Sequence, residues 1–125
     1  MRLPTALAAL AAAAFMAGAA QAQDPATDGQ YRATLARVIT DAAQGVCPAE
    51  IMASELLAAC EEQASQMAPA IASLGPVESM AFLSAEGEGA ERLELYEVTF
   101  ASGQVLTFGI GGLADGKFST MFARG

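Results

Sequence analysis

The sequence of 125 residues contains no histidine and no tryptophan, and it has only two cysteines. Without histidine, the chain lacks the commonest general base of enzymes and the commonest metal ligand. This absence excludes Ser-His-Asp and Cys-His catalytic arrangements and most zinc sites. We therefore predict that the protein is not an enzyme and that it has no catalytic residue, metal or cofactor.

Positive charge is also scarce. After residue 22 the chain carries five basic and fourteen acidic side chains, which gives a net charge of −9. Nucleic acids and anionic lipids bind proteins that present a positive surface. The charge therefore argues against a nucleic-acid or anionic-membrane partner, and it favours solubility.

Long apolar runs are absent except at the N-terminus, "MRLPTALAALAAAAFMAGAAQA". Arg2 precedes the run, and Ala20-Gln21-Ala22 has the small-x-small pattern that signal peptidase cleaves after. The run is too short and too alanine-rich for a membrane span of ~20 strongly apolar residues. No cysteine ends the run, which argues against a lipid anchor. We predict a signal peptide at residues 1–22, and a periplasmic or secreted mature protein without a membrane span.

We expect a flexible tip at residues 23–29 and a single domain at residues 30–125. Two helical patterns open this domain. The first begins after a cap at Asp28 and stops at Gly45, and its apolar stripe consists of Tyr31, Leu35, Val38, Ile39 and Ala42. The second ends at Gly75-Pro76, and Pro69 predicts a kink within it. The apolar seam of the second helix consists of Leu57, Cys60, Ala64, Met67, Ile71 and Leu74.

Four alternating segments follow the helices, at residues 77–85, 92–101, 104–110 and 117–123. Ser102-Gly103 and Asp115-Gly116 are typical of tight hairpin turns. Short turns require neighbouring strands to be antiparallel. The sequence therefore predicts an α+β fold, in which two N-terminal helices pack on one face of a four-stranded antiparallel meander sheet.

Cys47 and Cys60 lie in the segment "VCPAEIMASELLAAC". Their spacing does not fit a C-x-x-C redox site, and two thiols without histidine are too few for a metal site. A disulfide suits an exported protein, while free buried thiols and a reactive thiol are the alternatives. One straight helix would separate the two Cα atoms by roughly 20 Å, whereas a disulfide needs them within about 7 Å. The disulfide therefore requires that no straight helix run through this segment. A cap at Ser54 on a helix starting at Glu55, with residues 48–53 folding back, would allow the bond.

The alternation of the strands gives the sheet two different faces. The face toward the helices holds a candidate ligand pocket, lined by Tyr96, Phe100, Phe108 and Phe122. The opposite face carries a mixture of polar and apolar side chains, many of them small. An antiparallel sheet can leave such a face in water. On that face we predict a partner surface, formed by Leu95, Val105 and Met121, beside strand edges that invite pairing.

Four carboxylates cluster near the first hairpin, at Glu86, Glu88, Glu91 and Glu94. Their oxygens are suitable calcium ligands, but the segment lacks the D-x-D-x-D-G pattern of a dedicated calcium loop. A solvated acidic turn is the better interpretation of this cluster.

Three segments resemble a small module of secreted bacterial proteins. They are "SLGPVESMAFL", Tyr96-x-Val98-x-Phe100-x-x-Gly103 and "GIGGLADGKFSTMF", all within residues 67–124. That module has a cystatin-like or NTF2-like helix-on-sheet shape and often follows β-lactamase-like serine hydrolase domains. Because the module is an accessory without catalytic residues, the resemblance implies no active site.

Together these patterns indicate a non-catalytic exported accessory or protein-interaction domain. Its partner would be an unidentified protein or a second copy of the chain in a weak homodimer. The alternative is a small-molecule binding module, with a pocket between the helices and the sheet.

Overall fold

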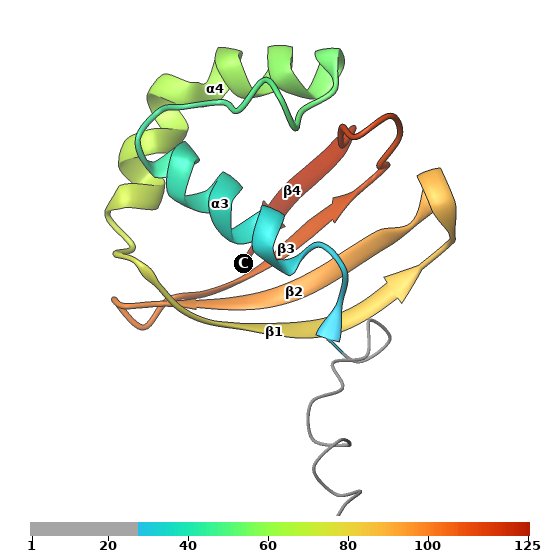
Figure 1. The fold of residues 1–125 in the computed structure, drawn as a ribbon. Helices are drawn as coiled ribbons and strands as arrows, with labels where there is room; N and C mark the ends of the chain where they lie inside the picture. Colours follow the sequence, from blue (N-terminus) through green and yellow to red (C-terminus); the bar gives the residue numbers. More distant parts are fainter. Residues whose placement is uncertain (1–27) are drawn as a thin grey trace, which may run out of the picture.

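The computed structural model describes residues 28–125, which form two helices followed by a four-stranded antiparallel sheet (Figure 1). The elements are α3 (Arg32–Ala43), α4 (Ser54–Ala72), β1 (Val77–Glu86), the 3-10 turn η2 (Gly89–Glu91), β2 (Leu93–Phe100), β3 (Val105–Gly111) and β4 (Thr120–Arg124). The strand order is β1-β2-β3-β4. The predicted fold class is confirmed. The predicted signal peptide and most of the predicted tip fall on residues 1–27, outside the described residues.

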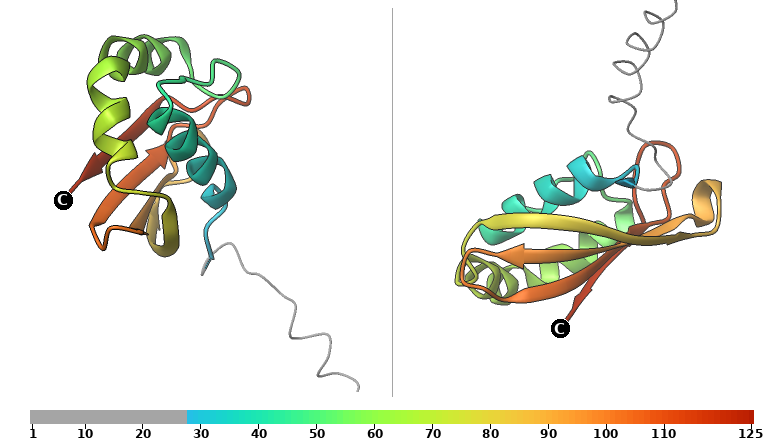
Figure 2. Two further views of the ribbon diagram at one scale, coloured as in Figure 1. Left: turned by 90° about the vertical axis from the view of Figure 1, so that its left-hand side faces the viewer. Right: turned by 90° about the horizontal axis from the view of Figure 1, so that it is seen from below.

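Both helices lie on the same side of the sheet, as the two views of Figure 2 show. We call the face toward the helices the inner face and the opposite one the outer face. The helices pack more extensively on each other than on the strands. Helix–sheet contacts are therefore limited, and α4 in particular stands away from the sheet.

The core lies between α3 and the inner face. The apolar stripe of α3 contributes Tyr31, Leu35 and Ile39, as its spacing predicted. The sheet contributes Tyr96, Val98, Phe100, Phe108 and Ile110. Phe118, which lies two residues before the start of β4, completes this side of the core. Tyr31 packs edge-on against Phe118, with ring centres 4.9 Å apart. Aromatic packing of this kind adds to the free energy gained by burial.

The seam of α4 faces the rest of the domain, but Cys60 is its one fully buried residue. The other seam residues are half-buried, because α4 touches the sheet so little. Figure 1 shows that α4 bends along its length, and Pro69 lies inside it. A bend is expected there, since proline removes a backbone hydrogen bond of the helix.

The disulfide between Cys47 and Cys60 is present, with the two Cα atoms 6.0 Å apart. A turn makes this possible, because the backbone N–H of Ile51 donates to the carbonyl of Pro48 at 3.1 Å. The predicted cap was wrong: α4 starts at Ser54, and no side chain caps it. The N–H of Ala53 donates instead to the carbonyl of Phe118 at 2.8 Å, so backbone pairing positions the start of the helix.

The last strand starts later than predicted, at Thr120. Phe118 pairs with the chain before α4, because its N–H donates to the carbonyl of Ile51 at 2.9 Å. The backbone N–H of Ser119 then donates to two successive carbonyls. They are that of Gly111, the last residue of β3, at 3.2 Å, and that of Gly112, the residue after the strand, at 3.3 Å. Pairing therefore resumes one residue out of step. Such a shift moves every following side chain of the strand to the other face.

Candidate functional site

An apolar row crosses the outer face of the sheet. Leu95 pairs with Gly109 on one side and with Ser84 on the other, Gly109 pairs with Phe122, and Leu83 precedes Ser84 at a bulge in β1. Leu83 is 49% exposed and Phe122 is 37% exposed. Val105, further along β3, is 42% exposed. In the right-hand view of Figure 2 the sheet lies in front of both helices, so no described element covers this face.

The ring of Phe122 lies directly over Gly109. A Cβ atom at Gly109 would be 2.3 Å from a carbon of that ring, so a side chain at this position would require the ring to move. The guanidinium of Arg124 lies 5.7 Å from the centre of the same ring, within cation–π range. The outer face thus carries an aromatic ring next to a positive charge.

The structure places the predicted partner residues on different faces. Leu95 and Val105 lie on the outer face, as predicted. Met121 packs against the core instead, and Phe122 takes its place outside. Their exchange corrects the prediction, and its cause is the one-residue shift at Ser119.

The predicted pocket residues are likewise divided. Tyr96 and Phe100 are completely buried in the core and line no cavity among those described. Phe108 and Phe122 do border a cavity of about 300 Å³ between the helices and strands β3 and β4, Phe122 as part of the edge strand β4 although its ring lies over Gly109 on the outer face. Other residues around this helix–sheet cavity include Val38, Cys60, Met67, Leu106 and Met121.

The helix–sheet cavity is almost entirely apolar. Gln63 is the one polar side chain among the residues that line it. Its volume lies at the lower end of the range for ligand pockets, about 300–1,000 Å³. The cavity therefore suits a small apolar molecule, and it offers one side chain to orient a polar group.

A buried carboxylate joins α3 to the sheet. Glu94, on the inner face of β2, has no exposed surface. Its Oε1 accepts hydrogen bonds from the Tyr96 hydroxyl at 2.6 Å and from the Tyr31 N–H at 3.0 Å. Its Oε2 accepts from Arg92 Nε at 2.7 Å and from the Gln30 N–H at 2.9 Å. A negative charge before a helix is favourable, because the N-terminus of a helix is electropositive.

Burial and hydrogen bonding act in opposite directions on the pKa of Glu94. Burial raises this pKa, but the hydrogen bonds from Tyr96, Gln30, Tyr31 and Arg92 together outweigh burial and hold it below its ordinary value. Burial, followed by the hydrogen bond to Glu94, raises the pKa of Tyr96. At neutral pH the carboxylate is therefore ionised and the hydroxyl remains a donor. With both oxygens occupied, Glu94 anchors the fold rather than serving as a base.

Sequence reasoning missed this role of Glu94. Its three predicted companions, Glu86, Glu88 and Glu91, are exposed as expected, but the solvated interpretation was wrong for Glu94. The missed signal was the two-residue alternation, which places Glu94 on the same face as Tyr96. Among residues 28–125, no group of three or more potential ligands is arranged to hold a metal ion.

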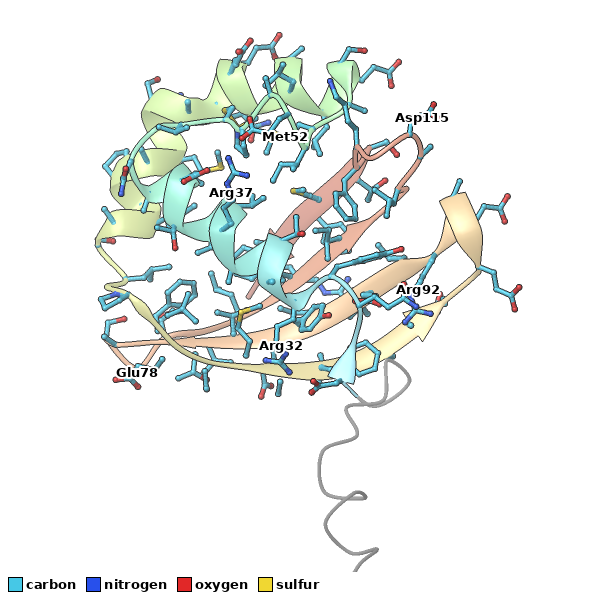
Figure 3. All side chains as sticks on the ribbon, in the orientation of Figure 1. Arg32, Arg37, Met52, Glu78, Arg92 and Asp115 are labelled. Atoms are coloured by element: carbon cyan, nitrogen blue, oxygen red, sulfur yellow. A yellow bond between two sulfur atoms is a disulfide. The ribbon has the colours of Figure 1, made fainter. Side chains whose placement is uncertain are left out.

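Two more open depressions lie on the described surface. One, of about 520 Å³, runs along α3 and the end of α4 and carries no charged side chain. The other, also of about 520 Å³, borders Arg92, which Figure 3 labels. The charge of Arg92 is paired with Glu94, since Arg92 Nη2 lies 2.7 Å from Glu94 Oε2. Neither of the helices in residues 28–125 has the length and apolar character that crossing a membrane requires. Comparison with family models, curated proteins and solved structures gives no match for this chain.

Proposed function

We propose that this protein is a non-catalytic exported domain that binds a protein partner through the outer face of its sheet. The observation that carries the proposal is the apolar row of Leu83, Leu95 and Phe122. Single apolar side chains are common on protein surfaces. A connected row on an uncovered sheet face is instead typical of an interaction site.

Two other observations support an exported accessory role. The disulfide between Cys47 and Cys60 is typical of oxidising compartments such as the periplasm. The resemblance of residues 67–124 to accessory modules of secreted bacterial proteins agrees with a role without catalysis. The predicted signal peptide at residues 1–22 completes this interpretation.

Site-specific photo-crosslinking in cells that naturally make the protein tests the proposal. A photoreactive amino acid replaces Leu83 or Val105 on the outer face. The matched control replaces Val46, which is 47% exposed but lies on the loop after α3. We expect a discrete protein adduct from both outer-face positions and none from position 46. Equal adducts at all three positions, or none at any of them, would contradict the proposal.

A second candidate function is the binding of a small apolar molecule in the helix–sheet cavity. The specific observation in its favour is the cavity of about 300 Å³ with an almost entirely apolar lining. Because the protein is strongly acidic, a neutral ligand is favoured over an anionic one. A fatty alcohol has the right chemistry, with an apolar chain for the cavity and a hydroxyl for Gln63.

Thermal unfolding in the presence of hexanol, octanol or decanol tests this second function. A ligand that binds the folded state raises Tm in proportion to its affinity and concentration. We expect Met67→Trp, which fills the cavity, to abolish the rise, and Leu83→Trp on the outer face to preserve it. An equal rise in both variants would locate binding elsewhere, and no rise in the unaltered protein would remove this candidate.

A further inference from the structure

A charged row lies beside the apolar row on the outer face. In strand register, Ala81 pairs with Glu97, Glu97 with Thr107, and Thr107 with Arg124. The row therefore holds one anion, on β2, and one cation, on β4. Two strand spacings separate them by about 10 Å, too far for an ion pair within one molecule. Neither side chain forms an ion pair with any other residue in the described part of the chain.

We propose that the outer face docks on the outer face of a second copy of this chain, so that Glu97 of each copy pairs with Arg124 of the other. This inference rests on the proposed function and names the partner for the same surface. A two-fold axis makes such an interface self-complementary, because each contact occurs twice.

Two kinds of two-fold axis can bring these faces together. An axis parallel to the strands, between β2 and β3, places β2 against β3 of the other copy and β1 against its β4. Glu97 then lies next to Arg124 of the second copy, and Leu83 faces Phe122. Stacked sheets commonly pack in this way, with their strands nearly aligned.

An axis perpendicular to the strands would place β2 against β2 and β4 against β4. Glu97 would then face the same strand of the second copy, and Arg124 likewise. The opposite charges would stay two strands apart, and like charges would approach each other. Like charges across an interface disfavour association. The charge pattern therefore selects the axis parallel to the strands.

The size of the face sets the strength of the dimer. Four strands at ~4.8 Å spacing and about five residues at ~3.3 Å rise give a footprint of roughly 300 Å² per copy. Stable complexes bury about 800 Å² per partner. The net charge of −9 after residue 22 also opposes association. Both facts make this a weak, concentration-dependent dimer, which moderate salt strengthens by screening the long-range repulsion.

Sedimentation analysis over a concentration series tests the pairing directly. The proteins compared are the mature chain, Glu97→Arg, Arg124→Glu and the double variant Glu97→Arg/Arg124→Glu. Each single change places like charges together, and we expect it to raise the dimer Kd about tenfold or more. The double variant exchanges the two charges and should return Kd to within about threefold of the original value.

Lys117→Glu provides the matched control, because it makes the same charge change as Arg124→Glu at an exposed hairpin away from the outer face. We expect it to leave Kd within about threefold. Far-ultraviolet spectra and Tm verify that every variant is folded.

Three results would overturn the inference. They are a monomer at every concentration, a dimer that is insensitive to both single changes, and a double variant no tighter than the single ones. A monomer that still gives adducts with another protein from Leu83 and Val105 would refute the homodimer but preserve the proposed interaction function. If neither dimers nor adducts were found, both the homodimer and the proposed interaction function would be refuted.

Discussion

Glu94 connects parts of the chain that are 64 residues apart in the sequence, since its carboxylate accepts the N–H of Gln30. A buried carboxylate costs stability unless its charge and its hydrogen-bonding capacity are satisfied. Arg92 balances the charge, and the Tyr96 hydroxyl and two backbone donors occupy the oxygens. The arrangement therefore fixes the start of α3 against β2.

Replacement of this carboxylate should be costly. Glu94→Gln keeps the shape but leaves Arg92 without a counter-charge and directs an amide NH₂ at other donors. We expect it to lower the free energy of unfolding by about 3 kcal/mol, measured by urea denaturation. Glu97→Gln, on the exposed face of the same strand, is the control and should change it by less than about 0.5 kcal/mol. Equal effects of the two changes would argue against an anchoring role.

The same cluster predicts how stability depends on pH. The pKa of Glu94 is lowered from 4.5 in the folded protein. Its contribution is therefore complete above that value and is lost as the pH falls below it. The pKa of Tyr96 is raised from 10.0, so its contribution is lost as the pH rises above 10. Urea denaturation across the pH range should show that the free energy of unfolding falls at both acid and alkaline pH. In the Glu94→Gln variant the fall at acid pH should be smaller. An unchanged acid slope in that variant would count against this assignment.

At the scale of elements, β4 carries the clearest departure from simple alternation. Continuous pairing from Phe118 would have placed Phe122 inside and Met121 outside. Phe118 pairs instead with the chain before α4, and the strand resumes with the opposite faces. The connection between the two layers, rather than the strand itself, decides which side chains β4 buries.

Lysine substitutions at adjacent positions of β4 should therefore differ sharply. Met121→Lys places a charge against the core, and we expect a loss of about 2 kcal/mol in the free energy of unfolding. Phe122→Lys, on the outer face, should cost less than about 1 kcal/mol. Chemical denaturation at low protein concentration provides the comparison. The reverse order would restore the original prediction for this strand.

The disulfide stabilises the loop that leads into α4. The two cysteines are 13 residues apart in the sequence. Closing a loop of this length adds about 3 kcal/mol to the free energy of unfolding in the chain-entropy model. In a domain of this size, such a loss lowers Tm by roughly 10–20 °C. Calorimetry of the Cys47→Ser/Cys60→Ser variant should show this decrease. Two free thiols in unfolded, unreduced protein would show that the bond does not form.

At the scale of the whole molecule, a small domain with few helix–sheet contacts needs additional links between its layers. The pairing of Phe118 with the chain before α4 and the carboxylate of Glu94 are two such links, while the disulfide joins the loop after α3 to α4 within the helical layer. The first two attach the helical half to the sheet half, and the disulfide holds the helical half together. None of these links uses a side chain of the outer face, so that face remains free to contact a partner.

Export is a prediction for the whole chain. Protein isolated from the envelope or medium of cells that make it should begin near Gln23, because signal peptidase cleaves after the small-x-small pattern. Intact-mass analysis measures this directly. A mass that still includes residues 1–22 would contradict the predicted signal peptide and the periplasmic or secreted location.

Local sequence patterns were sufficient to predict the fold class. Helical spacing placed Tyr31, Leu35 and Ile39 on one stripe, and two-residue alternation placed Tyr96 and Phe108 on the inner face. These periods are properties of a single helix or strand, so they can be recognised without its neighbours. The turn at Asp115-Gly116 was recognised for the same reason, since positive φ angles at both residues are a local requirement.

The sites depended on contacts between distant segments. The faces of β4 follow from the pairing of Phe118 with Ile51, and the role of Glu94 follows from donors near α3. No local period encodes such a partner. The sequence alone therefore determined the elements, their order and the charge of the molecule, because these follow from near neighbours and composition. Only the tertiary structure decided which side of β4 is buried and which carboxylate lies inside, because hydrogen-bond donors remote in sequence must be brought together before they can select a partner.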